Sequence, residues 1–237
     1  MKKTNDREEL LQALKKTSIP DQELLLNLGL FGSRRSLSRL LMMHDIYKKI
    51  IPVAGSIVEF GPRWGQNLAL FSNFRGMYEP YNYNRLILGF DTFSGFPSID
   101  PKDGSVLKKG DYSVTKGYEE ELTHILECHE AEYPNNHRRK FELVKGDAIK
   151  TFPAYLKKNP HTMIALAYFD FDLYAPTKAC LELVLKHVTK GSVLAFDELN
   201  WAEFPGETIA VMETMGLSAH ALRRDPLNPL GAYLVIE

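Results

Sequence analysis

Cysteine is scarce in this chain: Cys128 and Cys180 are the only two among 237 residues. Two cysteines are too few for a disulfide framework, and their spacing does not match a zinc site. Long apolar runs are also missing, since no uninterrupted stretch approaches the roughly 20 residues that a membrane-spanning helix needs. No apolar signal core follows Met1-Lys2-Lys3. These absences predict a cytoplasmic protein with reduced thiols and no membrane contact.

An excess of charge of one sign is absent as well. Lysine and arginine number 29 against 30 aspartates and glutamates, which gives a formal net charge of -1. No basic stripe is interleaved with aromatic residues, so the charge pattern predicts no nucleic-acid partner. The chain is 44% hydrophobic and 25% charged. That composition is ordinary for a globular protein with one substantial core.

The first fifty residues carry two amphipathic patterns. Leu10, Leu11 and Leu14 recur at helical spacing in DREELLQALKK, and SLSRLLMMHDIYKKI has a second stripe of leucine and methionine. Such a stripe is typical of a core or of a subunit interface. We therefore expect an N-terminal helical extension over residues 1–52 and a main domain over residues 53–237.

After Pro52, short and continuously apolar runs alternate with helical patterns. Strands that are buried on both faces have this texture, and their alternation with helices predicts an α/β fold with a mainly parallel, doubly wound sheet. The turn-rich DPLNPLG between the last two runs predicts that the sheet ends in an antiparallel pair. The seven expected strands cover residues 56–60, 85–90, 140–146, 162–170, 191–197, 217–224 and 231–237.

Residues 92–139 interrupt this rhythm. They separate the second and third expected strands and contain one expected helix, near 118–132. The part from 92 to 117 is rich in glycine, proline, aspartate and lysine. A long insertion at the carboxyl end of a strand is typical of a lid or a binding loop, although some are merely mobile.

The turn after the first sheet strand reads E-x-G-x-x-x-G, with Glu59, Gly61 and Gly65. In an open α/β sheet, ligands bind beyond the carboxyl ends of the strands. The chain lacks the G-x-G-x-x-G dinucleotide fingerprint and the G-x-x-x-x-G-K-[ST] phosphate loop. An acid in this turn suits the sulfonium and ammonium groups of S-adenosylmethionine better than a pyrophosphate. The alternative is that the two glycines are only structural.

Two further acids follow the second and third strands. Asp91, with Thr92 after it, stands where a carboxylate can accept hydrogen bonds from two ribose hydroxyls. Asp147 and Ala148 fall at the level expected for the adenine ring. Asp91 could instead cap a loop, and Asp147 could be the N-cap of the next helix. Acids at three successive strand ends together indicate a cofactor site.

Four carboxylates follow the fourth and fifth strands: Asp170, Asp172, Asp197 and Glu198. These strands are expected to be neighbours about 5 Å apart. Carboxylates so close together need a cation or a shared proton. Ligands that are all oxygen favour Mg²⁺, Mn²⁺ or Ca²⁺ over zinc. Asp172 could instead be the base that takes a proton from a sugar hydroxyl, and helix capping is the alternative for Asp170 and Asp197.

Five motifs in this order, VEFGPRWGQN, GFDTFSGFP, KGDAIKTFP, FDFDLYAPT and AFDELN, resemble the macrocin O-methyltransferase family. The closest likeness is to its nucleotide-deoxysugar 3-O-methyltransferase branch. The resemblance implies a Rossmann-like class I methyltransferase fold, S-adenosylmethionine and Mg²⁺ as cofactors, and dimers or larger homo-oligomers. It also implies that Asp172 is the general base and that the metal ligands are Asp170, Asp197 and Glu198.

The hypothesis that follows is a Mg²⁺-dependent O-methyltransferase that acts on a sugar hydroxyl. A nucleotide-linked deoxysugar in natural-product, antibiotic or glycan biosynthesis is the expected acceptor. Two alternatives remain open at the level of sequence. One is a nicotinamide-dependent oxidoreductase, against which the glycine spacing argues. The other is a non-catalytic assembly module, although such a module would be expected to lose the acids that this chain keeps.

Overall fold

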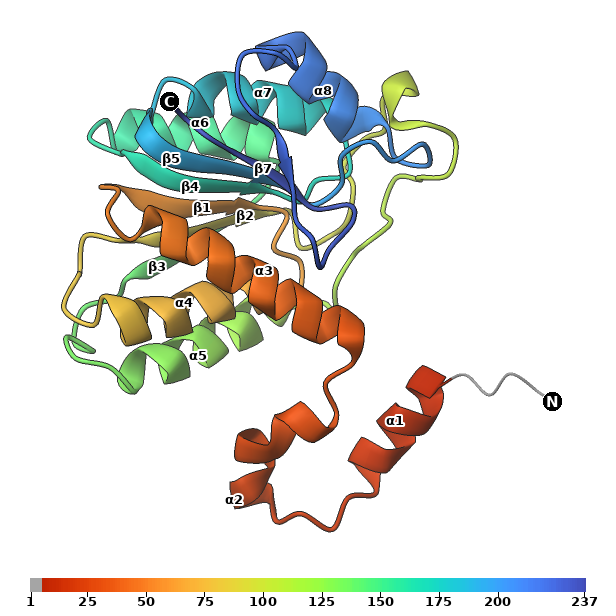
Figure 1. Cartoon of the computed structure of the whole chain (residues 1–237), viewed down its shortest axis with the longest axis vertical. Helices are drawn as coiled ribbons and strands as arrows, with labels where there is room; N and C mark the ends of the chain where they lie inside the picture. The colour runs from red at the N-terminus through yellow and green to blue at the C-terminus, as the bar shows by residue number, and fades with distance from the viewer. Residues whose placement is uncertain (1–5) are drawn as a thin grey trace.

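The fold is built on one seven-stranded sheet with the strand order β3-β2-β1-β4-β5-β7-β6 (Figure 1). The structure is a computed structural model that describes residues 6–237, so residues 1–5 of the predicted extension lie outside it. β1 to β5 pair in parallel, and β7 pairs antiparallel with both β5 and β6. The strands are β1 Ser56–Phe60, β2 Ile87–Asp91, β3 Phe141–Lys145, β4 Ile164–Phe169, β5 Val188–Phe196, β6 Arg223–Arg224 and β7 Ala232–Val235.

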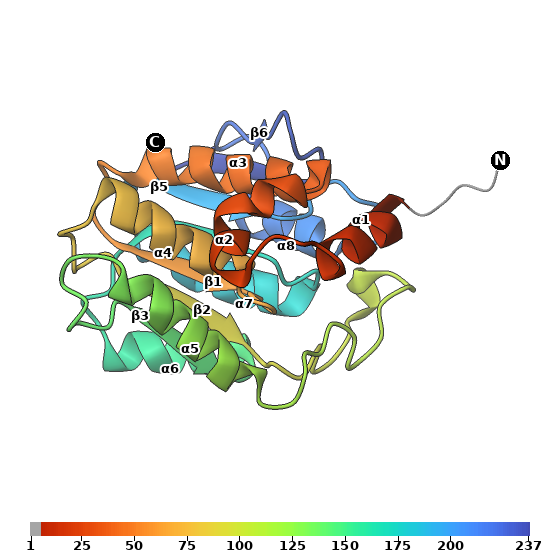
Figure 2. The ribbon, with the colours of Figure 1, turned by 90° about the horizontal axis from the view of Figure 1, so that it is seen from below.

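Helices cover both faces of the sheet. α3, α4 and α5 lie on one face and α6, α7 and α8 on the other (Figures 1 and 2). Within residues 6–237, no helix is both long and apolar enough to cross a membrane. The helices of the two layers are α3 Arg34–Ile50, α4 Gln66–Tyr78, α5 Tyr118–Ala131, α6 Ala148–Lys158, α7 Tyr174–Val184 and α8 Gly206–Met215.

The predicted doubly wound, mainly parallel sheet is confirmed, and so is its antiparallel end. The continuous apolar runs have the expected cause, because residues of β1 and β4 contribute to a separate core on each face of the sheet. The expected strand at 217–224 is much shorter than predicted, since only Arg223–Arg224 pairs. Leu217 and Leu222 in that segment are exposed, so no burial holds a longer strand in register.

The N-terminal segment divides into two parts. α1 (Asp6–Lys15), α2 (Asp21–Leu24) and the 3₁₀ helix η1 (Leu25–Leu30) lie away from the sheet (Figure 1). α3 packs on the sheet instead, and its buried side chains, Met42, Met43, Ile46, Tyr47 and Ile50, are part of the core. The predicted extension therefore includes one helix that packs as part of the sheet body.

Arg85 fixes the end of α3 that lies farthest from the carboxyl edge of the sheet. Its guanidinium, 2% exposed, pairs with Glu79 and donates to the backbone carbonyls of Ile50, Val53 and Gly55. A cation at a helix C-terminus satisfies carbonyls that lack a helical partner. Arg85 thus packs α3 against the start of β1, on the opposite edge from the strand ends that carry the predicted site.

The insertion between β2 and β3 contains the short helix η2 (Pro101–Asp103) and then α5, which agrees with the helix predicted near 118–132. Asp103 ties the insertion to the sheet body. Its buried carboxylate accepts the backbone N–H of Tyr174, at the start of α7, over 2.6 Å. The insertion is therefore anchored beside the end of β4.

Candidate active site

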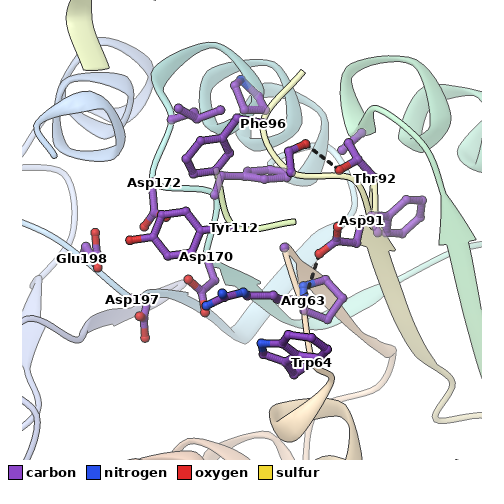
Figure 3. A pocket seen from close by; sticks show the side chains of 18 of the residues that line it. Arg63, Trp64, Asp91, Thr92, Phe96, Tyr112, Asp170, Asp172, Asp197 and Glu198 are labelled. Atoms are coloured by element: carbon purple, nitrogen blue, oxygen red, sulfur yellow. Dashed lines mark hydrogen bonds between the residues drawn. The ribbon is translucent and has the colours of Figure 1, made fainter. Parts of the chain in front are cut away.

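A cavity of about 380 Å³ opens at the carboxyl ends of the parallel strands. This is the size of a small-molecule site. Nine of the eleven residues predicted from the sequence line it, and Glu59 and Gly65 do not. The nine are Gly61, Asp91, Thr92, Asp147, Ala148, Asp170, Asp172, Asp197 and Glu198. Figure 3 shows Asp91 and Thr92 on one side of the cavity and the four later acids on the other.

The turn after β1 runs directly past the end of β4. Gly61 has φ 80°, and a Cβ there would overlap the backbone carbonyl oxygen of Asp170. Glycine is therefore required by this close approach of two strand ends. Arg63 in the same turn is left-handed, with φ 50°, and its guanidinium lies 4.8 Å from the ring of Tyr112. The turn thereby carries a positive charge into the cavity.

Glu59 lies behind the cavity wall rather than in it. It is 1% exposed, and its Oε1 accepts a 2.8 Å hydrogen bond from Asn67 Nδ2. Burial raises the pKa of Glu59 to about 8, against the opposing effect of that hydrogen bond. Asn67 does line the cavity, and its Oδ1 has no hydrogen-bond partner among residues 6–237. A buried acceptor of this kind suits a ligand with a cationic donor group.

Asp91, at the end of β2, lies across the cavity from the four later acids (Figure 3). Its two oxygens accept the backbone N–H groups of Arg63, over 2.7 Å, and of Phe93, over 2.6 Å. Each oxygen keeps a further lone pair that can accept a hydroxyl. Thr92 Oγ1 donates to the carbonyl of Gly95, which shapes the first bend of the insertion.

Asp147 is the N-cap of α6, which the sequence analysis gave as the alternative to a role in cofactor binding. Its side chain accepts the backbone N–H of Ile149 over 3.0 Å. Asp147 also lines the cavity together with Ala148, the first residue of α6. Capping and a place at the cavity wall are therefore compatible.

Asp170 and Asp197 follow β4 and β5 directly and share one cation. Arg39 Nη2 lies 2.5 Å from Asp197 Oδ1, and Arg39 Nη1 lies 3.5 Å from Asp170 Oδ2. The hydroxyl of the buried Tyr168 also donates to Asp197 Oδ1, over 2.5 Å. Burial and the neighbouring Asp197 raise the pKa of Asp170 well above its ordinary value. These two acids are therefore held by a side chain from the N-terminal helix α3.

Asp172 and Glu198 form the second pair of acids, and both line the cavity. Burial and the neighbouring Asp172 raise the pKa of Glu198 to about 9. Asp172 is left-handed with φ 59°. Non-glycine residues rarely adopt this conformation, and they cluster at functional sites.

Several residues that line the cavity were not predicted, among them Arg39, Arg63 and Tyr112. Arg63 lies inside the motif VEFGPRWGQN, but the glycines and the acid of that motif were the residues used to predict the site. Tyr112 lies in the insertion, where its ring is 5.2 Å from that of Phe96. Arg39 is far away in sequence from the acids that it contacts, and no local pattern points to it.

The acids have the chemistry of a site for a hard cation, but they are not gathered around one point. In the described part of the chain, no three histidine, cysteine, aspartate or glutamate side chains converge closely enough to hold a metal ion. The donors are all oxygen, as Mg²⁺ prefers. A buried oxygen, Glu198 Oε2, lacks a hydrogen-bond partner within residues 6–237. The donor set therefore fits a divalent ion, while Arg39 holds two of its members.

Comparison with solved structures identifies the family. The chain superposes on CalS11, a calicheamicin methyltransferase, with a TM-score of 0.94 and 44% identity over 97% of this chain and 90% of that chain. It superposes on apo CalS11, a TDP-rhamnose 3'-O-methyltransferase of calicheamicin biosynthesis, with a TM-score of 0.87 and 42% identity over 97% and 92%. The chain therefore belongs to the macrocin O-methyltransferase family, nearest its nucleotide-deoxysugar branch.

Fold and enzyme class agree with this membership. The O-methyltransferase NovP matches with a TM-score of 0.60 and 17% identity over 87% of this chain and 81% of that chain, which supports the fold alone. Neither the family models nor the curated proteins gave a match. The chain is thus a class I, S-adenosylmethionine-dependent O-methyltransferase, as the motifs predicted, and neither the nicotinamide enzyme nor the non-catalytic module is supported.

Proposed function

We propose that this protein transfers a methyl group from S-adenosylmethionine to a hydroxyl of a nucleotide-linked deoxysugar, with a divalent cation such as Mg²⁺. One observation carries the proposal. Two acids assigned to the cofactor, Asp91 and Asp147, line the same cavity as the four acids that follow β4 and β5. The chain is 42–44% identical to a sugar O-methyltransferase. The acceptor class rests on that likeness.

The cofactor would lie along the ends of β1, β2 and β3. Bound there, it supplies an electrophilic methyl group. Asp91 has free lone pairs for two ribose hydroxyls, and Asp147 with Ala148 forms the wall expected for the adenine ring. Asn67 Oδ1 offers an acceptor to the ammonium group, with Glu59 behind it. These residues would place the adenosine end of the cofactor at β2 and β3 and its amino-acid end beside α4.

The acids at the ends of β4 and β5 would supply the chemistry of the acceptor. Asp170, Asp197 and Glu198 would hold the divalent ion, which lowers the pKa of a bound hydroxyl. Asp172 accepts the hydroxyl proton. With the cofactor held by Asp91, Asp147 and Ala148, its methyl group would pass to the deprotonated acceptor oxygen, and sulfur would keep the bonding electron pair. Alignment of oxygen, carbon and sulfur accounts for much of the rate.

A homo-oligomer, dimer or larger, belongs to the same proposal. The 3₁₀ helix η1 exposes Leu25, Leu26 and Leu30 to 77%, 86% and 65%. Adjacent apolar side chains so fully exposed are typical of an interaction surface. The segment lies apart from the sheet it precedes (Figure 1), so a second copy of the chain is the partner we propose.

The test is methyl transfer to TDP-rhamnose and related nucleotide deoxysugars, followed by mass spectrometry, beside calorimetric titration with S-adenosylhomocysteine. Asp172→Asn should lose transfer by about 10²-fold or more, the scale of a removed general base, and keep its affinity for S-adenosylhomocysteine. Asp91→Ala should lose that affinity. Transfer by Asp172→Asn at the wild-type rate would refute the assigned base, and no S-adenosylhomocysteine binding by folded wild type would refute the cofactor site.

A further inference from the structure

Arg39 pairs with two of the four acids, a contact that the proposed chemistry does not require. It reaches from α3 to carboxylates on two neighbouring strands, with 2.5 Å to Asp197 and 3.5 Å to Asp170. Its side chain is 26% exposed, against 13% for Asp197 and 24% for Asp170. This is a partly buried ion pair between groups far apart in the chain.

We propose that Arg39 is a built-in counter-ion that competes with the divalent cation for Asp170 and Asp197, so that the metal binds only when the N-terminal turns of α3 give way. The inference rests on the metal part of the proposed function and adds a residue and a moving segment to it. It concerns how the site is loaded rather than which reaction it performs.

The competition follows from the oxygens that Arg39 uses. Two of the three acids that would hold the ion, Asp170 and Asp197, direct an oxygen at the guanidinium. Asp197 Oδ1 also accepts the Tyr168 hydroxyl. A guanidinium and a divalent ion cannot share these oxygens at contact distance, because their charges repel. With Arg39 in this position, the described acids do not converge around one point.

The packing of α3 indicates which part of it can move. Residues 34–41 expose Leu37, Leu40 and Leu41, to 44%, 38% and 46%, whereas Met42, Met43 and the later core positions are fully buried. Arg85 holds the other end of the helix through the carbonyl of Ile50. Release of Arg39 therefore affects residues 34–41 and leaves the second half of α3 in place.

Coupling of this kind is reciprocal. If the cation displaces Arg39, it loosens residues 34–41, and anything that holds these residues against the sheet weakens cation binding. The apparent affinity for the cation equals the intrinsic affinity multiplied by the fraction of molecules in which Arg39 has withdrawn. Removal of the guanidinium then strengthens cation binding without any change to the acids.

The experiment is a calorimetric titration of the full chain with MnCl₂. The variants are Arg39→Met, Arg39→Gln and, as the matched control, Arg34→Met. Arg34 is on the same helix with the same charge but does not line the cavity. We expect both Arg39 variants to bind Mn²⁺ at least about fivefold more tightly than wild type, and Arg34→Met to match wild type. Equal affinity in wild type and the Arg39 variants would overturn the inference.

Hydrogen exchange separates competition from a simple change of charge. In wild type, MnCl₂ should speed amide exchange within residues 34–41 and leave residues 42–50 protected. In Arg39→Met, exchange in residues 34–41 should be fast already and unaffected by the ion. Tighter binding with no change of exchange in wild type would also overturn the inference.

The same samples titrated with S-adenosylhomocysteine keep the two proposals apart. Cofactor binding with no Mn²⁺ binding in any variant would overturn the role of Arg39 and of the metal, and leave the cofactor site standing. Loss of cofactor binding with the expected Mn²⁺ pattern would instead refute the cofactor site.

Discussion

Glu59 has the surroundings of a neutral acid. It is enclosed beneath the first turn, and burial raises its pKa to about 8, with Asn67 as its one hydrogen-bonding neighbour in the described structure. Its Oε2 is buried with no partner among residues 6–237. An ionised carboxylate in such a place is costly. The residue that the sequence assigned to cofactor binding therefore carries a pH-dependent penalty on folding.

The sign of that penalty can be tested with Glu59→Gln. Glutamate ionises near pH 4.5 when unfolded, whereas the folded protein keeps this proton up to about pH 8. The folded state thus binds more protons between these values, and wild-type stability falls as pH rises through the window. Urea unfolding at pH 5 and pH 8.5 should give a variant about as stable as wild type at pH 5 and about 1–3 kcal/mol more stable at pH 8.5.

The control for this prediction is Glu142→Gln, because Glu142 is exposed on β3. It should follow wild type at both pH values. A Glu59→Gln variant whose stability keeps a constant offset from wild type across the window would contradict a proton held at Glu59.

At the scale of elements, the insertion acts through the start of α7. Asp103 Oδ1 accepts the N–H of Tyr174, and Asp103 Oδ2 accepts the N–H of Asp100 over 2.7 Å. Asp172 lies two residues before Tyr174, in its left-handed conformation. One buried side chain thereby connects the insertion, the beginning of α7 and the proposed base.

Asp103→Ala should therefore have two effects. Loss of a cap and two buried acceptors should lower the free energy of unfolding by about 1–2 kcal/mol. Methyl transfer should fall more than S-adenosylhomocysteine binding does, since the disturbed element carries Asp172 and not Asp91. Urea unfolding, rate assays and calorimetry measure the three quantities.

The matched variant in the same insertion is Asp111→Ala, whose side chain accepts only the local N–H of Lys108 within the described structure. It should change stability little. If Asp103→Ala lowered cofactor binding and transfer equally, the insertion would not act through the start of α7.

At the scale of the whole molecule, α1, α2 and η1 are the part of the chain that does not pack on the sheet (Figure 1). The exposed leucines of η1 lie on a segment that is away from the sheet (Figure 1). Burying each such side chain against a partner contributes about 1.5–3 kcal/mol. The segment can therefore account for a stable association between copies.

We expect light scattering after size exclusion to show a dimer or larger assembly for the wild type. The double variant Leu26→Glu with Leu30→Glu should shift the mass toward one chain, because burying unpaired carboxylates is costly. Leu217→Glu, at a position 53% exposed after α8, should leave the mass unchanged. A wild-type monomer, or a double variant that keeps its assembly, would contradict this role.

The sequence by itself determined the sheet and the list of acids at its carboxyl edge. Continuous apolar runs reflect burial on both faces, and the residue after each run must lie at one edge, so Asp91, Asp170 and Asp197 were predictable from local pattern alone. The length of the 217–224 strand was not, because exposed residues there leave pairing unconstrained.

Only the tertiary structure decided which charges meet. Arg39 contacts Asp197 across 158 positions of sequence, and that contact depends on how α3 packs rather than on any periodicity around either residue. Packing of α4 against β1 likewise decides that Asn67 lines the cavity and that Glu59 lies behind it. Local sequence determines where a strand ends, whereas the position and ionisation of a side chain depend on neighbours brought in from distant elements.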